Sequence, residues 1–125
     1  MKEIITNKAP KAIGPYSQAI MSKGHIYCSG QIPIDPMTGE VVAGGISEQT
    51  AQVIKNLIAV LEDQGSSLEK VVKVTAYLVD MSEFPKFNEV YGQYFKFDPK
   101  PARATVGVMA LPKNVRVEID LIAEE

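Results

Sequence analysis

Hydrophobic residues recur with the period of an α-helix in the middle of the chain. One apolar stripe is formed by four residues at i, i+3, i+4 and i+7, namely Ile54, Leu57, Ile58 and Leu61. Ser47 is a suitable N-cap because its hydroxyl can accept a hydrogen bond from an unpaired backbone N–H. Gly65 stands where a left-handed residue commonly ends a helix. The pattern therefore predicts an amphipathic helix between Ser47 and Gly65.

A second helical pattern follows, and its stripe is aromatic. The stripe consists of Phe84, Phe87, Tyr91, Tyr94 and Phe95. Asp80 and Glu83 have the spacing of a capping box, with Asp in place of the usual Ser or Thr. Pro85 falls in the first turn, where its missing N–H costs little, and residues 98–101 (Asp-Pro-Lys-Pro) end the helix. Such a stripe packs against a sheet more often than it lines a ligand site.

Strand patterns account for most of the remaining chain. Val71–Val79 is rich in β-branched residues and predicts a central strand. Shorter strands are predicted at Lys2–Thr6, Tyr16–Met21, His25–Ser29, Ala102–Met109 and Val115–Ala123. Residues 22–24 (Ser-Lys-Gly) indicate a hairpin turn. Residues 30–45 are interrupted by proline and glycine and indicate an ordered excursion with a turn at Asp35–Gly39.

The order of elements is β-β-β-α-β-α-β-β, and the 125 residues suit one domain, residues 1–125. Two helices on one face of a mixed six-stranded sheet make a two-layer α+β fold. The other face of the sheet still carries apolar residues and needs a cover. Self-association would provide it, so we expect a homo-oligomer.

Composition narrows the function. Hydrophobic residues make up 46% and charged residues 22%, an ordinary globular balance. The net charge of −2 argues against a nucleic-acid partner, which needs a basic face. No apolar run approaches the roughly 20 residues that span a bilayer, so no membrane association is expected. With one Cys and one His the chain has no intrachain disulfide and poor metal ligands, which fits the cytoplasm and no metal site.

Arg103 is the residue best suited to bind an anion. It begins a strand just after Pro99 and Pro101, so its backbone is stiffly placed. Its neighbours are small and leave room for a ligand over the guanidinium: Ala102, Ala104, Thr105 and Gly107. The planar guanidinium matches a carboxylate with two parallel hydrogen bonds. A structural ion pair at the start of a strand is the alternative.

Glu118 lies inside an otherwise apolar strand. Because strand side chains alternate, it shares one face with Asp120 and Ile122, and that face is either solvated or part of a pocket. If the last two strands formed a direct hairpin, Gly107 would lie opposite Glu118, with Arg103 on the same face. A strand between them would remove this register. An Arg and a carboxylate beside a cavity could fix an anionic substrate and move protons to and from water.

Four other residues are candidates with ordinary alternatives. Tyr16 follows a Gly-Pro pair and could cap a ligand or simply pack. Ser29 and Gly30 end a strand with a hydroxyl and a backbone that a ligand can approach closely, and a plain turn is the ordinary explanation. Asn88 lies on the aromatic helix and could face a neighbouring subunit or solvent.

Six short segments, in order over nearly the whole chain, form a composite motif. They are AIGPYSQA at 12–19, SGQIP at 29–33, residues 35–40, PARATV at 101–106, Leu111–Pro112 and VEI at 117–119. Together they resemble the RidA (YjgF-like) family of reactive-intermediate deaminases. The resemblance implies a chorismate-mutase-like fold in a homotrimer, with clefts between subunits.

The resemblance also implies an activity: cofactor-free hydrolysis of 2-imino acids, or of enamine tautomers such as 2-aminoacrylate, to 2-keto acids and ammonia. This is the reaction of a 2-iminobutanoate/2-iminopropanoate deaminase. By position, Arg103 resembles the carboxylate-binding arginine and Glu118 the acid that orients or activates water. The cleft lining would comprise Tyr16, Ser29, Gly30 and Asn88.

Two positions depart from the family pattern. Thr105 stands where many members carry Cys, which puts a thiol role in doubt, although its hydroxyl could hydrogen-bond substrate. Met109 is bulkier and less polar than the small or basic residue expected. Two other functions stay open: a small-molecule-binding regulatory trimer without catalysis, and an RNA-directed translation inhibitor. The acidic balance and the lack of a basic stripe argue against RNA.

Overall fold

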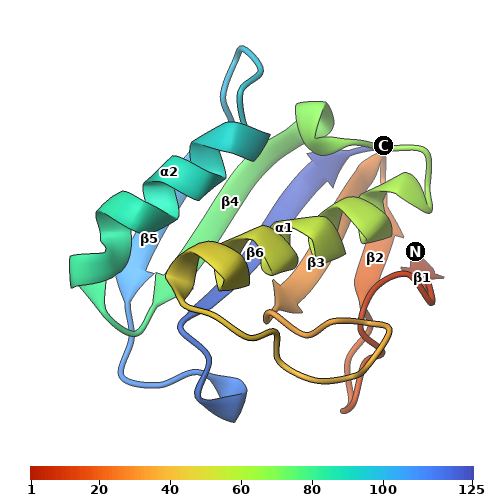
Figure 1. Cartoon of the computed structure of the whole chain (residues 1–125). Coiled ribbons are helices and arrows are strands. Elements are labelled where there is room, and N and C mark those ends of the chain that lie inside the picture. Colours follow the sequence, from red (N-terminus) through yellow and green to blue (C-terminus); the bar gives the residue numbers. More distant parts are fainter.

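Six strands form one sheet in the order β1-β2-β3-β6-β4-β5, and two α-helices lie across one face of it (Figure 1). The computed structural model describes residues 1–125 throughout. The helices are α1 (Ile46–Glu62) and α2 (Phe84–Tyr94). The strands are β1 (Lys2–Ile4), β2 (Ala19–Ser22), β3 (His25–Gln31), β4 (Val71–Leu78), β5 (Ala102–Gly107) and β6 (Val117–Glu124). The predicted α+β fold, with a mixed six-stranded sheet and two helices, is confirmed.

One parallel pair decides the topology. β4 and β5 run parallel, and α2 is the crossover between them, whereas all other neighbours are antiparallel. β4 therefore lies between β5 and β6, so the conditional hairpin of the last two strands does not form and the alternative, a strand between them, is confirmed. In the actual register Tyr77 lies opposite Glu118, and Gly107 lies beside Leu78.

The core lies between the sheet and the two helices. The apolar stripe of α1 is confirmed, since Ile54, Leu57 and Leu61 are fully buried and Ile58 packs at the edge of the core. The sheet contributes alternate residues of β4 and β6: Val74, Ala76, Leu78, Val117, Ile119 and Leu121. This alternation fixes which side chains of β6 face the helices and which face away.

The start of α1 differs from the prediction, whereas its end agrees. Ser47 is not the N-cap, because α1 begins at Ile46 and Gly45 takes the cap position. The Glu48 carboxylate accepts a hydrogen bond from the Gly45 N–H at 2.8 Å, so an acid in the first turn satisfies that donor. Beyond the last turn Gly65 has φ +73°, the left-handed conformation that was expected there.

The predicted capping box of α2 is wrong. Asp80 caps a short 3-10 turn instead, accepting a hydrogen bond from the Ser82 N–H at 2.9 Å. Glu83 forms an ion pair with Arg116, at 2.8 Å between Oε1 and Nη1. Pro85 does fall in the first turn of α2, as predicted.

The strand predicted at Tyr16–Met21 begins only at Ala19. The preceding residues are held as a loop by the buried side chain of Gln18. Its amide accepts from the Thr6 N–H at 2.8 Å and donates to the Pro10 carbonyl at 2.7 Å. The loop backbone is thus paired with one side chain rather than with a neighbouring strand.

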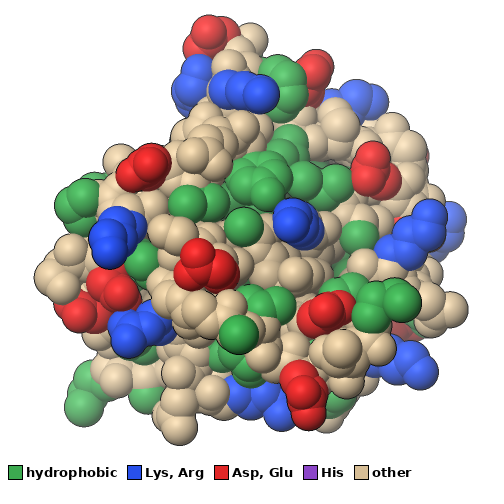
Figure 2. Space-filling model, in the orientation of Figure 1, with side chains coloured by type: hydrophobic (Ala, Val, Ile, Leu, Met, Phe, Trp, Pro, Cys, Tyr) green, Lys and Arg blue, Asp and Glu red, His purple; other side chains and the backbone are tan.

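The two faces of the sheet are exposed very differently. On the side that bears the helices, basic and acidic side chains are interspersed with apolar ones (Figure 2). On the other side Tyr27 is 46% exposed, and Ile20 and Ile122 are half-buried. No helix has the length and apolar character needed to cross a lipid bilayer.

Candidate active site

Arg103 lies beneath α2 and has no acidic partner. It pairs in register with Val74, so it shares the face of the sheet that is covered by the helices. Its Nη1 donates a hydrogen bond to the side-chain oxygen of Asn88 at 2.8 Å. The two ion pairs of the chain join other residues, Lys100 with Asp98 and Arg116 with Glu83. The alternative of a structural ion pair at Arg103 is therefore excluded.

Three aromatic rings of α2 hold the Arg103 guanidinium. Its central carbon lies 4.6 Å from the ring centroid of Tyr91, 5.7 Å from that of Phe84 and 5.8 Å from that of Phe87. Cation–π contacts of this kind orient a guanidinium without neutralising it. The aromatic stripe thus packs on the sheet, as predicted, and also positions a partly exposed positive charge.

Two hydroxyl groups beside Arg103 are buried without a hydrogen-bond partner, those of Tyr91 and Thr105. Burial raises the pKa of the Tyr91 hydroxyl, and the nearby Arg103 charge opposes that rise. Thr105 lies two residues along β5 from Arg103 and therefore on the same face. Because its hydroxyl is enclosed, substrate reaches it only if the surrounding side chains move.

Glu118 lies on the opposite face of the sheet. It follows the buried Val117 on β6, and its carboxylate covers Gly30 of β3. The side chain is half-buried, and burial raises its pKa above the ordinary value for Glu, with the charge of Asp120 adding to the rise. Asp120 itself accepts a hydrogen bond from the Tyr77 hydroxyl at 2.8 Å. A carboxylate whose pKa lies closer to neutrality is a better proton-transfer group.

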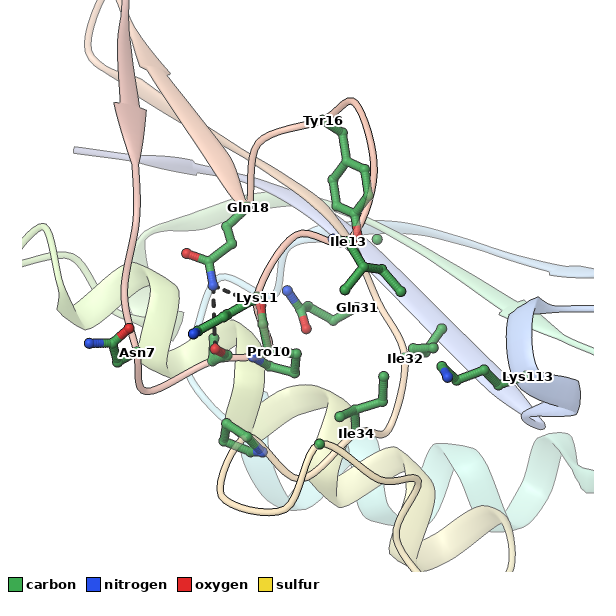
Figure 3. Close-up of a pocket in the computed structure, with 14 residues that line it drawn as sticks. Asn7, Pro10, Lys11, Ile13, Tyr16, Gln18, Gln31, Ile32, Ile34 and Lys113 are labelled. Atoms are coloured by element: carbon green, nitrogen blue, oxygen red, sulfur yellow. Dashed lines mark hydrogen bonds between the residues drawn. The ribbon is translucent and has the colours of Figure 1, made fainter.

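Ser29 and Tyr16 lie close to this half of the site. The Ser29 hydroxyl donates to the Ser17 carbonyl at 2.6 Å, which ties the end of β3 to the preceding loop. Tyr16 is 50% exposed, and its hydroxyl accepts a hydrogen bond from the Ile13 N–H. Tyr16 and Gly30 both line a pocket of about 500 Å³ (Figure 3).

The predicted site residues therefore form two groups. Arg103, Asn88 and Thr105 meet where β5 passes beneath α2. The second group gathers around the Glu118 carboxylate and the adjoining pocket: Gly30, Ser29 and Tyr16. Within one chain the sheet separates the two groups, so a small ligand cannot touch both Arg103 and Glu118 of this chain.

Sequence reasoning missed two features of the site. Packing is the favoured role of Tyr91 in the sequence, whereas its place on the crossover helix between β4 and β5 also puts it over the edge strand, beside Arg103. The sequence predicts no role for Gln31 in the site, whereas its side chain is buried in the wall of the pocket. No group of three or more His, Cys, Asp or Glu side chains is arranged to hold a metal ion.

The sequence pattern of the endoribonuclease L-PSP family matches residues 6–125. The chain belongs to this family. A RutC family protein of Pyrococcus abyssi is 58% identical over 123 residues, covering 98% of this chain and 96% of the relative. The human 2-iminobutanoate/2-iminopropanoate deaminase is 48% identical over 120 residues, covering 96% of this chain and 87% of that protein.

Solved structures agree with the family assignment. A putative endoribonuclease of Thermotoga maritima is 52% identical and has a TM-score of 0.96, covering 100% of this chain and 98% of that one. RidA from an Antarctic Psychrobacter is 43% identical with a TM-score of 0.95, covering 100% of both chains. The resemblance to the RidA (YjgF-like) family that the sequence motifs indicated is confirmed.

Proposed function

We propose that this protein is a deaminase that hydrolyses reactive 2-imino acids, and their enamine tautomers, to 2-keto acids and ammonia. The observation that carries the proposal is the Arg103 guanidinium, which is positioned by α2 and has no carboxylate partner in its own chain. A cation held in this way suits the carboxylate that every 2-imino acid carries. The activity named for the human relative, which covers 96% of the chain, supports the same reaction.

The proposed site is shared between two subunits of a homotrimer. Arg103 and Glu118 face opposite sides of the sheet, so one substrate reaches both only if each comes from a different chain. The half-buried apolar residues on the open face supply a reason to associate, because they stay partly exposed in the single chain. In such an assembly Asn88 and Tyr16 line the cleft from opposite sides.

The reaction needs one anchor and one proton-transfer group. The anchor, Arg103, binds the substrate carboxylate and fixes the position of C2. Water attacks C2 of the protonated imine while Glu118 takes a proton from the water. The C2–O bond forms, and the C=N π pair moves to nitrogen. An enamine enters the same route after a proton is added at C3.

Collapse of the tetrahedral intermediate returns the site to its starting state. Glu118 gives its proton to the amino nitrogen, and the C2–N bond breaks as the hydroxyl oxygen forms the keto group. Ammonia takes up the hydroxyl proton and leaves as ammonium. General acid–base catalysis of this kind contributes about 10²–10⁴-fold, which suits a substrate that already hydrolyses in water. The proposed reaction needs no cofactor. We also place the protein in the cytoplasm, where its one buried, unpaired cysteine would stay reduced.

A coupled assay tests the proposal. A threonine dehydratase generates the imine, and release of 2-ketobutyrate is followed with and without the protein. We expect the wild-type chain to accelerate release and Arg103→Ala to lose nearly all of that effect. Full activity in Arg103→Ala would remove Arg103 from the mechanism. Binding of 2-ketobutyrate without turnover would favour the regulatory trimer instead.

A further inference from the structure

The pocket beside Gly30 is larger than the substrates named for the human relative require. Its volume is about 500 Å³, within the range of roughly 300–1,000 Å³ typical of small-molecule sites. The 2-iminobutanoate molecule has only a two-carbon side chain and would fill only part of this space as it stands in the single chain. Because Gly30 also contacts the Glu118 carboxylate, the pocket opens beside the proposed reaction centre.

Part of the pocket wall is aliphatic. Ile13, Ile32 and Ile34 line it, together with Pro10 and Pro36 (Figure 3). Ile34 is buried at 9% exposure, whereas Ile13 is 76% exposed in the single chain. A surface of this kind favours methylene groups, since their burial removes apolar area from water.

One side-chain amide in the wall of this pocket has no hydrogen-bond partner in the protein. Gln31 is only 6% exposed, yet no protein group hydrogen-bonds its carboxamide, which points toward Lys11 and Pro10 (Figure 3). Gln18, in the same wall, contrasts with it, because its amide is saturated by Thr6, Ala9 and Pro10. Because the Gln31 carboxamide borders the pocket and is not used by the protein, its two donors and its acceptor are available to a ligand.

The charged side chains that line the pocket are all basic. Its charged lining residues are Lys11 and Lys113, no acidic side chain lines it, and neither lysine forms an ion pair. The two lysines lie on opposite sides of Gln31 in Figure 3. In a protein with a net charge of −2 this is a local region of positive potential.

We infer that this pocket holds the ligand's side chain and selects side chains that end in an anionic group. The ligand class is 2-imino and 2-keto dicarboxylic acids with an aliphatic spacer. The spacer lies along the isoleucines, and the distal carboxylate accepts a hydrogen bond from Gln31 in the field of Lys11 and Lys113. This inference rests on the proposed function, because it takes Arg103 of a neighbouring subunit as the anchor of the first carboxylate.

Calorimetric titration of two stable keto acids tests the inference on the full chain. The compounds 2-oxoadipate and 2-oxohexanoate share a chain length and differ in a terminal carboxylate against a terminal methyl. We expect the wild-type protein to bind 2-oxoadipate at least about tenfold more tightly, which corresponds to about 1.4 kcal/mol. Equal affinities would overturn the inference.

Single substitutions test which pocket residues cause the preference for 2-oxoadipate. Lys11→Met and Lys113→Met should each weaken 2-oxoadipate binding several-fold and leave 2-oxohexanoate unchanged, and Gln31→Leu should abolish the preference. Lys8→Met is the matched control, because Lys8 stands in the same loop as Lys11 but lines a different groove. A preference for 2-oxoadipate that persists in both lysine variants would also overturn the inference. Because the two lysines lie at the surface, this test remains valid even if Gln31→Leu fails to fold.

Turnover of 2-iminobutanoate in the same preparations separates the two proposals. Turnover without a preference for 2-oxoadipate would sink the inference and leave the proposed function standing. The preference without any turnover would support the dicarboxylate site and count against the deaminase reaction.

Discussion

The Glu118 carboxylate lies in the space that a side chain at position 30 would need. A β-carbon built on Gly30 would be 2.9 Å from Cδ and 3.2 Å from Cγ of Glu118. Carbon atoms pack at about 3.5–4.0 Å, so any side chain at this position must push Glu118 aside. The absence of a side chain at Gly30 therefore sets where the proposed proton-transfer group lies.

Gly30→Ala should consequently reduce activity more than stability. A displacement of about 1 Å can cost as much as 10²-fold in rate, and we expect kcat/KM on 2-iminobutanoate to fall at least tenfold. Gly92→Ala is the control, since a β-carbon at this exposed position of α2 meets no atom within 4 Å. It should keep full activity and gain about 0.5–1 kcal/mol of stability. Unchanged kinetics in Gly30→Ala would mean that the position of Glu118 does not matter.

Asn88→Asp tests whether the free charge of Arg103 is what binds substrate. Asn88 accepts a hydrogen bond from Arg103 as a neutral amide, and an aspartate there would form an internal ion pair of nearly the same shape. We expect KM to rise at least about tenfold, because the guanidinium is then occupied by a carboxylate that competes with substrate. Asn88→Ala should have a smaller effect, since the aromatic contacts remain.

A thermal-unfolding measurement and a control variant at a second arginine accompany the Asn88→Asp experiment. Asn88→Asp should unfold at or above the wild-type temperature, which rules out loss of structure as the cause. Arg116→Ala is the control, because Arg116 is already paired with Glu83 and belongs to neither group of site residues. An Asn88→Asp protein with wild-type KM would show that Arg103 does not bind the substrate carboxylate.

The raised pKa of Glu118 predicts an acid limb in the pH profile. The ionised carboxylate accepts the proton from water, so kcat/KM should fall as the pH drops through the Glu118 pKa, which lies above the ordinary Glu value. The negative charge of Asp120 contributes to that rise, after burial. Asp120→Asn should therefore lower the Glu118 pKa and move the acid limb to lower pH. If the acid limb stays at the same pH in Asp120→Asn, it reports the titration of a group other than Glu118.

The same shift has a consequence for stability. A carboxyl group whose pKa is raised by folding binds its proton more tightly in the folded state, so its ionisation at neutral pH disfavours folding. The stabilising contribution is present at low pH and is lost as the pH rises through the folded-state pKa. Glu118→Gln should therefore lose activity while its melting temperature at neutral pH stays the same or rises. A large fall in melting temperature would indicate a structural role for the carboxylate.

Local patterns in the sequence predicted the features that depend on local geometry. The stripe of Ile54, Leu57 and Leu61 follows from the helical period, and the outward face of Glu118 follows from strand alternation. The N-cap was misplaced by two positions, from Gly45 to Ser47, because several residues near a helix start can satisfy the same donors.

The sequence does not predict which strands pair when they are far apart in the chain. Nothing near Arg103 in the chain indicates that β5 pairs with β4 rather than with β6. The pairing is set by α2, which connects β4 to β5 as a crossover between parallel strands. A direct hairpin of the last two strands would put Arg103 and Glu118 on one face, whereas the intervening β4 leaves them on opposite faces. Asn88, the hydrogen-bond partner of Arg103 on α2, stands 15 residues away in sequence, so the contact appears only in the fold.

Mixing two inactive variants tests whether Arg103 and Glu118 of different subunits form one site. Arg103→Ala and Glu118→Ala chains are each expected to be inactive as pure proteins. If they are unfolded together and refolded in equal amounts, random assembly places an intact Arg103 against an intact Glu118 at about one interface in four. About a quarter of the wild-type activity should therefore return, whereas the two proteins mixed without unfolding should gain activity only as fast as subunits exchange. Each variant refolded alone controls for the procedure. Because a site built within one chain would always lack one of the two groups, the refolded mixture would then stay inactive, and the shared cleft would have to be abandoned.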